Sequence, residues 1–220
     1  MSIPVTEIEE CPSFLSDEEA AAVPVAALTA WRATLIKAAI KPGDQVLITG
    51  IGGGVAIFCL QIAVAYGAKV YVTSGNEQKL DRAKQLGAIG GVNYKDSEWT
   101  KQLLEMLPPD RPYLDSLIHS AGGEIVTESL RLLRFGGIIS SYGMTLGPKV
   151  TFPMQAVMKN IEVSYISVEF HTEKLMPCIV QRLNDGFKKR VQGGSTIYRQ
   201  ASNPANSRLG LLNGGHPFCE

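Results

Sequence analysis

A glycine-rich turn between apolar segments constrains this chain more than any other feature. Residues 45–73 read QVLITGIGGGVAIFCLQIAVAYGAKVYVT, an apolar strand, a turn with four glycines, an apolar helix and a second strand. In such a βαβ unit the glycines let the backbone turn sharply and approach a pyrophosphate, which binds free amides at the start of the helix. The sequence therefore predicts a dinucleotide-binding unit.

The spacing of these glycines departs from the strict GxGxxG pattern. Counting from the first two glycines, Val55 stands where the third should be. The run Gly53-Gly54-Val55-Ala56 describes the turn better, with Ala56 as the small residue that lets helix and strand pack closely. A glycine-rich turn alone can be a flexible connection, but the strand before it and the helix after it give the required context. We expect amides around Gly53 and Gly54 to bind the pyrophosphate.

Composition excludes several other classes of protein. The 220 residues are 45% hydrophobic and carry no formal net charge, with Lys and Arg scattered along the chain. This indicates a globular protein and argues against nucleic acid or an acidic membrane surface as a partner. No stretch has the length of a membrane span or the pattern of a secretion signal. We expect a soluble cytoplasmic protein that binds a small-molecule substrate.

Cysteines and histidines form no pattern typical of a metal site or a disulfide framework. The four cysteines include no CxxC pair, and no histidine stands at ligand spacing from them. The histidines, His119, His171 and His216, occur singly, and each is more readily structural than catalytic. We predict no metal site and assign no catalytic residue.

Strand and helix patterns alternate along most of the chain. We expect strands over 45–49, 69–73, 91–94, 114–119 and 137–142, and helices over 53–66, 77–86, 97–107 and 124–133. Two earlier helices are expected, one over 15–22 with Ser16 as its N-cap and one over 25–39. The near-continuous apolar strands suit a parallel sheet covered on both faces. The predicted fold class is therefore α/β, a Rossmann doubly wound parallel sheet.

In such sheets a ligand binds beyond the carboxyl ends of the strands, where the strand order reverses. The segments to consider are 50–56, 74–76, 120–123 and 143–145. Gly122 and Gly143 lie in the last two and allow close approach to a flat cofactor. Alternatively, the Gly122-Gly123 and Gly136-Gly137 pairs only end their elements.

The end of the second strand indicates which nicotinamide cofactor is bound. An acidic residue there accepts hydrogen bonds from the ribose 2′-hydroxyl of NAD and would repel the 2′-phosphate of NADP. No acidic residue occurs between Asp44 and Glu77. Ser74 and Asn76 can donate hydrogen bonds there, and Lys79 follows on the next helix. NADP(H) is favoured, although Lys79 alone could be an ordinary solvated charge.

Several dispersed motifs resemble one family. The stretches LSDEEAAAVPVAALTAWRAT, KPGDQVLITG, GGVA, KVYVTSGNEQKLDRAKQLGA, VNYKD and RFGGIISSYG follow one another over about Leu15 to Val163. Together they resemble the medium-chain dehydrogenase/reductase superfamily, on its zinc-independent, quinone-oxidoreductase side. The resemblance implies the cofactor-binding domain of an NADPH-dependent reductase. It assigns the pyrophosphate loop to Gly53, Gly54 and Val55, and the surroundings of the adenosine phosphate to Gly75, Lys79 and Tyr94.

The chain departs from that family in two ways. Val25 stands where zinc-dependent relatives carry a cysteine ligand. The family also places a GroES-like catalytic β-barrel ahead of this region, and only a short segment precedes Leu15. We therefore expect a chain that lacks this catalytic domain. The function implied is NADPH binding for hydride transfer to a carbonyl, an activated alkene or a quinone; the alternative is a non-catalytic nucleotide-binding fragment or isoform.

The far end of the chain departs from the family pattern as well. The Gly194-Ser195-Thr196 segment comes late, and a retained intron beginning at Val163-Ser164 is one hypothesis for the delay. The expected domains are N-terminal hinge and helices over 1–40, the Rossmann domain over 41–163, and a divergent, partly disordered tail over 164–220, mobile from Gly193 onward. Relatives dimerise through the sheet edge near the sixth strand, so a homodimer through this edge is one option.

Two other enzyme classes fit poorly. Short-chain dehydrogenases need a Tyr-x-x-x-Lys pair, and none of the seven tyrosines has a lysine at that spacing. Methyltransferases usually need an acid at the end of the second strand, where Ser74 stands.

Overall fold

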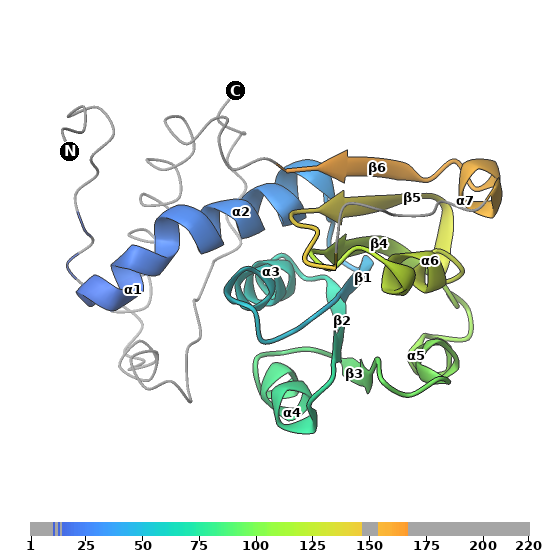
Figure 1. The fold of residues 1–220 in the computed structure, drawn as a ribbon, viewed down its shortest axis with the longest axis horizontal. Coiled ribbons are helices and arrows are strands. Elements are labelled where there is room, and N and C mark those ends of the chain that lie inside the picture. The colour runs from blue at the N-terminus through green and yellow to red at the C-terminus, as the bar shows by residue number, and fades with distance from the viewer. Residues whose placement is uncertain (1–10, 12, 14, 147–153, 167–220) are drawn as a thin grey trace.

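The chain forms a parallel sheet with helices on both faces. The computed structural model describes residues 11, 13, 15–146 and 154–166, and Figure 1 shows their arrangement. The six strands lie in the order β3-β2-β1-β4-β5-β6, and each neighbouring pair is parallel. The order reverses between β1 and β4. The prediction of a Rossmann doubly wound sheet is confirmed, while the expected tail after residue 166 lies outside the described residues.

The bounds of the elements follow the predicted alternation. The strands are β1 (Gln45–Ile48), β2 (Lys69–Ser74), β3 (Gly90–Asn93), β4 (Leu114–His119), β5 (Leu133–Ser141) and β6 (Glu162–Tyr165). The helices between and after them are α3 (Gly54–Ala65), α4 (Glu77–Gln85), α5 (Trp99–Met106), α6 (Glu124–Ser129) and α7 (Met154–Met158). Most predicted ends differ from these bounds by one or two residues.

The two helices expected before the sheet form one continuous helical run. It consists of α1 (Asp17–Ala22), η2 (Val23–Ala27), α2 (Leu28–Trp31) and η3 (Arg32–Lys37), in which η2 and η3 are π-helical. Ser16 caps its start: its hydroxyl accepts from the Glu19 amide, and the Glu19 carboxylate accepts from the Ser16 amide. The predicted break was wrong because Pro24 stands in a wide turn, where the Leu28 amide bonds to the Val23 carbonyl five residues back.

The segment between α6 and β5 also differs from the prediction. The helix expected to reach Leu133 ends at Ser129, and β5 begins at Leu133 instead of Gly137. The chain is already paired with β4 there, because the Leu114 amide donates to the Leu132 carbonyl at 2.8 Å. The Gly136-Gly137 pair therefore lies inside β5, next to a register irregularity between β4 and β5, and does not end the element.

Side chains alternate between two cores, one on each face of the sheet. Val46, Ile48, Val72 and Ile118 pack on the face that the N-terminal helical run, α3 and α4 cover. On the other face, which α5 and α6 cover, Leu47, Tyr71, Leu117 and Ile139 are buried. Both cores take residues from the same strands, and this explains the near-continuous apolar runs in the sequence.

A charged cluster joins the amino ends of three strands. The buried Asp115 carboxylate accepts from the Gln45 backbone amide at 2.8 Å, from the Arg111 guanidinium at 2.8 Å and from Arg134 Nε at 2.8 Å. These bonds lie at the opposite end of the sheet from the predicted ligand edge. Their role is to fix β1, β4 and β5 relative to one another.

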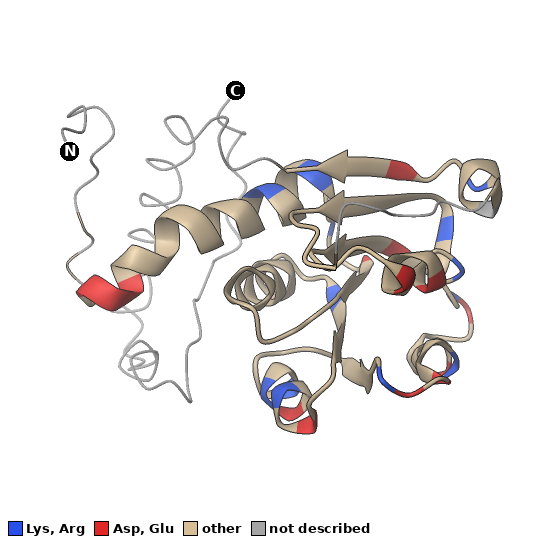
Figure 2. Ribbon diagram, viewed as in Figure 1, with Lys and Arg blue, Asp and Glu red and all other residues tan. Residues whose placement is uncertain are grey.

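Lys and Arg occur along the described elements together with Asp and Glu (Figure 2). Figure 2 shows acidic residues at the start of α1 and both signs together on α4. Among the described residues, no helix is both long and apolar enough to pass through a membrane.

Candidate functional site

The glycine turn after β1 is held against the end of β2. The Gly50 amide donates to Thr73 Oγ1 at 3.2 Å, and the Ile51 amide donates to the Thr73 carbonyl at 2.8 Å. Gly50 has φ +66° and Gly52 has φ +124°. Residues other than glycine rarely adopt such positive φ values. The turn needs these glycines for its shape, and Thr73 fixes its position.

Helix α3 starts directly from this turn with no side chain capping it. Gly53 is its N-cap, with ψ 147°, and the first intrahelical bond runs from the Ile57 amide to the Gly53 carbonyl at 3.1 Å. The amides of Gly54, Val55 and Ala56 therefore have no acceptor within the helix. Together with the helix dipole they suit an anion such as a pyrophosphate.

Lys79, near the start of α4, lies directly against the glycine turn. A Cβ placed on Gly52 would be 2.6 Å from Lys79 Cδ and 3.1 Å from Lys79 Nζ. The missing side chain of Gly52 is therefore what allows the ammonium group to lie beside the turn. This arrangement places a cation beside the glycine turn.

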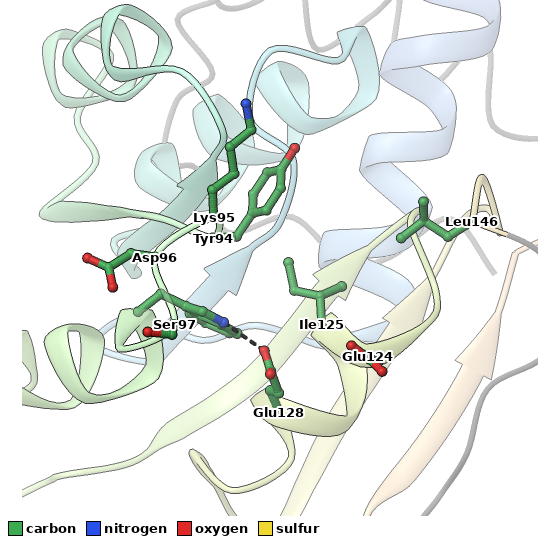
Figure 3. Close-up of a pocket in the computed structure, with 9 residues that line it drawn as sticks. Tyr94, Lys95, Asp96, Ser97, Glu124, Ile125, Glu128 and Leu146 are labelled. Atoms are coloured by element: carbon green, nitrogen blue, oxygen red, sulfur yellow. Dashed lines mark hydrogen bonds between the residues drawn. The ribbon is translucent and has the colours of Figure 1, made fainter.

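A second cation lies beside the end of β2. A Cβ on Gly75 would be 2.8 Å from Lys95 Cε and 2.9 Å from the Tyr94 hydroxyl oxygen. Figure 3 shows the side chains of Tyr94 and Lys95 side by side, pointing the same way from the end of β3. Gly75 thus leaves space for two polar groups that a larger residue would displace.

No acidic residue stands at the end of β2 before the first residue of α4. Ser74 is buried and its Oγ accepts from the Asn76 amide at 3.2 Å, while Asn76 Oδ1 accepts from the Lys79 amide at 3.2 Å as the N-cap of α4. Glu77 is the first acidic residue after the turn, and its Oε1 accepts from Asn93 Nδ2 at 2.8 Å. The corner at the end of β2 is therefore polar and cationic.

Gly122 follows β4, and Gly143 follows β5. The Gly122 amide donates to Nδ1 of the buried His119 at 3.4 Å, and the Gly143 carbonyl accepts from Ser141 Oγ at 3.1 Å. A Cβ on Gly143 would be 3.1 Å from Ser120 Cβ. Gly143 therefore allows the loop after β5 to pack closely against Ser120 in the loop after β4.

A cavity of about 390 Å³ opens next to Tyr94 and Lys95. Figure 3 shows it between the loop after β3 and helix α6, with Ile125 and Leu146 on one side. Trp99 also lines it and donates from Nε1 to Glu128 Oε2 at 2.7 Å. The lining is mixed, because the carboxylates of Asp96, Glu124 and Glu128 and the Ser97 hydroxyl stand beside these aromatic and apolar side chains.

The structure thus brings the predicted residues into three groups along the carboxyl edge. Gly53, Gly54 and Val55 begin α3, Ser74, Gly75, Lys79 and Tyr94 surround the end of β2, and Gly122 and Gly143 follow β4 and β5. Lys95 was not predicted as a site residue, although it directly follows Tyr94 and the loop after β3 belongs to the same edge. The role of Gly52 was not predicted either.

Nothing in the described part of the chain gathers into a metal-binding group of three or more His, Cys, Asp or Glu side chains. Val25, which we expected at the position of a zinc-ligating cysteine, lies in η2 and is 60% exposed.

The sequence pattern that defines the zinc-binding dehydrogenases matches residues 54–183. The chain belongs to this family. The match confirms the resemblance to the medium-chain dehydrogenase/reductase superfamily, and it runs past Val163, where we expected the resemblance to stop. It begins at the first residue of α3 and includes α4, β3 and the loops after β4 and β5.

Individual relatives agree with this assignment. The zinc-type alcohol dehydrogenase-like protein YogA of Leptosphaeria maculans is 49% identical over 166 residues, which make up 74% of this chain and 46% of that protein. The crystal structure of an NAD-dependent alcohol dehydrogenase has a TM-score of 0.73 at 32% identity, covering 84% of this chain and 53% of its own. The quinone oxidoreductase from Thermus thermophilus, solved also with NADPH, has a TM-score of 0.65 at 30% identity, covering 76% and 52%. The chain therefore spans about half the length of these relatives.

Proposed function

We propose that this chain binds NADPH and forms the cofactor-binding part of an oxidoreductase that passes hydride to a carbonyl, an activated alkene or a quinone. The observation that carries the proposal is the pair of lysines beside Gly52 and Gly75. A 2′-phosphate at the end of β2 would meet two ammonium groups there. NADH would leave both lysines without that partner.

The charges of this corner favour NADPH over NADH. Binding of NADH through its ribose hydroxyls needs a carboxylate at the end of β2. The nearest acid along the chain, Glu77, is engaged by the Asn93 side chain. Relatives of both kinds exist, since one similar structure is an NAD-dependent alcohol dehydrogenase and another was solved with NADPH. The two lysines of this chain support the proposal that the phosphorylated cofactor is the one bound.

The cavity beside Tyr94 and Lys95 suits the adenine base. These two residues line the cavity and also contact the space around Gly75. A base in the cavity would therefore be continuous with a phosphate beside Gly75, as in a 2′-phosphoadenosine. The apolar side chains of Ile125 and Leu146 give such a base a surface to lie against.

Binding and turnover are tested separately. We expect calorimetric titration to show binding of NADPH, and absorbance assays with a quinone, an aldehyde and an enone to show NADPH consumption if the substrate contacts are complete. Binding with no consumption supports the second candidate, a nucleotide-binding protein without turnover. This second candidate is kept because the aligned stretch makes up 46% of YogA, so that the likeness supports the cofactor-binding part alone. Absence of NADPH binding contradicts both.

A homodimer through β6 is a further part of this proposal, as is a cytoplasmic location. Among the described strands β6 is outermost and pairs with β5 alone. Its side chains Val163 and Tyr165 are 49% and 52% exposed. An apolar strand edge of this kind can pair with the same edge of a second copy across a two-fold axis. Sedimentation of the wild type and of Val163→Lys tests it, with the variant expected to be monomeric.

A further inference from the structure

Four polar side chains form a row across the carboxyl ends of the central strands. The strand registers, continued one residue past the end of β1, place Thr73 beside Thr49, Thr49 beside His119 and His119 beside Ser141. All four side chains are buried. Since Leu117 belongs to the core under α5 and α6, and side chains alternate along a strand, His119 lies on that same face. We call Thr73, Thr49, His119 and Ser141 the strand-end row.

Three members of the strand-end row each bond to the backbone of a glycine in the candidate site. Thr73 Oγ1 accepts from the Gly50 amide at 3.2 Å. His119 Nδ1 accepts from the Gly122 amide at 3.4 Å. Ser141 Oγ donates to the Gly143 carbonyl at 3.1 Å. The row therefore connects the rigid sheet to the glycine loops at the ligand edge.

His119 is the one member of the row whose bond depends on a proton. Its Nδ1 can accept from the Gly122 amide only while this nitrogen carries no hydrogen, and both ring nitrogens are donors in the charged imidazole. Burial lowers the pKa of His119 to about 4, so the uncharged ring is the form present near neutral pH.

Titratable groups on the neighbouring elements do not favour the charged form of the His119 ring. Burial is the cause of the lowered His119 pKa, with no contribution from a carboxylate or a cation among the described residues. On the elements that cover this face, the titratable side chains are Lys101 and Glu105 on α5 and Glu124 and Glu128 on α6; Tyr142 directly follows β5, and Cys59 lies on α3 in the core of the other face. Burial raises the pKa of Cys59 and of Tyr142, which keeps both uncharged. Glu128 accepts from Trp99 Nε1.

The loop that His119 holds has an unusual backbone. Gly122 has φ +74° and Gly123 has φ +66° with ψ −155°, after which α6 begins at Glu124. Consecutive positive φ values leave the loop dependent on its hydrogen bonds for a defined shape. The same loop is bonded to the loop after β5, through the Thr145 amide to the Ser120 carbonyl and the Leu146 amide to the Ala121 carbonyl. Leu146 in turn lines the cavity.

We propose that His119 is a positioning residue whose uncharged Nδ1 holds the 120–123 loop in the shape that receives the dinucleotide. This inference rests on the proposed NADPH binding. The His119 ring need not touch the cofactor, since it acts through the Gly122 amide. It also couples the protonation of one buried side chain to the affinity of the site.

Two substitutions distinguish the effect of losing the Nδ1 acceptor from the effect of losing the volume of the ring. His119→Asn keeps an oxygen acceptor near the position of Nδ1, whereas His119→Leu keeps an apolar side chain of moderate size and no acceptor. By calorimetry near neutral pH we expect His119→Leu to weaken NADPH binding by about 5- to 50-fold, because the Gly122 amide loses its partner. His119→Asn should stay within about 3-fold of the wild type. Melting temperatures are measured for both.

NADPH affinity measured over a range of pH tests the role of the His119 proton, because a purely structural role in packing would give no such pH dependence. Wild-type affinity for NADPH should fall as the pH is lowered from about 7 toward the His119 pKa of about 4, and this part of the pH dependence should be absent in His119→Asn. Nitrogen NMR of labelled histidine should show an unprotonated Nδ1 at neutral pH.

Specific results would overturn the inference. Equal losses in His119→Asn and His119→Leu would show that only the ring volume matters. An Nδ1 that carries a proton at neutral pH, or a His119→Leu variant with wild-type affinity, would exclude the positioning role while leaving NADPH binding intact. If the wild type itself binds no NADPH, the proposed function fails, and this proposal fails with it. If His119→Leu does not fold, the pH series on His119→Asn decides.

Discussion

The side chain of Lys79 lies against Gly52, so close that a single added carbon on Gly52 would be 2.6 Å from Lys79 Cδ. This contact joins the turn after β1 to the helix after β2. It also explains why the second glycine of the turn is needed. The relationship leads to two predictions on cofactor binding.

Loss of the Lys79 charge should weaken NADPH binding selectively. We expect Lys79→Gln to raise the Kd of NADPH by about 10- to 100-fold, the usual value of a charge-assisted hydrogen bond, and to change the Kd of NADH little. Lys84→Gln is the matched control, because Lys84 lies on the same helix and pairs with Asp81 on the exposed surface. Titration of each variant with both dinucleotides measures the difference. An equal loss for NADH would mean that Lys79 does not contact the 2′-phosphate.

A methyl group at Gly52 should displace Lys79. At Gly52 the backbone has a positive φ, and an added Cβ would also meet Lys79. Gly43→Ala is the matched control to Gly52→Ala, because the φ of Gly43 is also positive, +86°, but an added Cβ there would meet only open space. Both variants should lose about 1–2 kcal/mol of stability from backbone strain. Only Gly52→Ala should also lose NADPH affinity. Urea denaturation and calorimetry on the pair test this, and unchanged affinity in Gly52→Ala would argue against the site.

The charged cluster at the other end of the sheet should matter for stability and not for binding. Asp115→Asn weakens its bonds to Arg111 and Arg134, and we expect a loss of about 2–3 kcal/mol in the free energy of unfolding. Asp81→Asn, whose partner Lys84 is exposed, should cost less than about 0.5 kcal/mol. Urea denaturation gives both values. A large change in NADPH affinity for Asp115→Asn would show that this cluster is coupled to the ligand edge.

Stability should depend on pH through His119. Its pKa is about 4 in the folded chain against 6.5 ordinarily, so the unfolded chain binds the proton more readily. The contribution of His119 to the free energy of unfolding is therefore complete above about pH 6.5. It is lost as the pH falls toward 4, and the total loss is about 3 kcal/mol. The difference between wild type and His119→Asn in urea denaturation isolates this dependence from that of the carboxylates. A difference that does not change with pH would contradict the buried, uncharged ring.

The fold could be predicted because local and long-range signals agree. The apolar strands, the glycine turn and the acidic start of α1 each specify one structure, and β4 was predicted with its observed bounds. The predictions were wrong where contacts between segments distant in the sequence determine the bounds of an element. Pro24 stands in a π-helical turn that keeps the helix continuous, and pairing with β4 ends α6 before Leu133.

The sequence could predict which loops form the candidate site, but not which side chains contact one another there. The rule that ligands bind at carboxyl ends pointed to the glycine turn, the end of β2 and the loops after β4 and β5. It applies equally to the loop after β3, where Lys95 lies. The bond between His119 and Gly122 has no sequence signal, because a single histidine at a strand end is consistent with many roles.

The most direct measurement is a calorimetric titration of the wild-type chain with NADPH and with NADH in the same buffer. Two ammonium groups beside Gly52 and Gly75 predict that NADPH binds at least about 10-fold more tightly than NADH. Equal affinity, tighter binding of NADH, or no heat with either dinucleotide would contradict the proposed site.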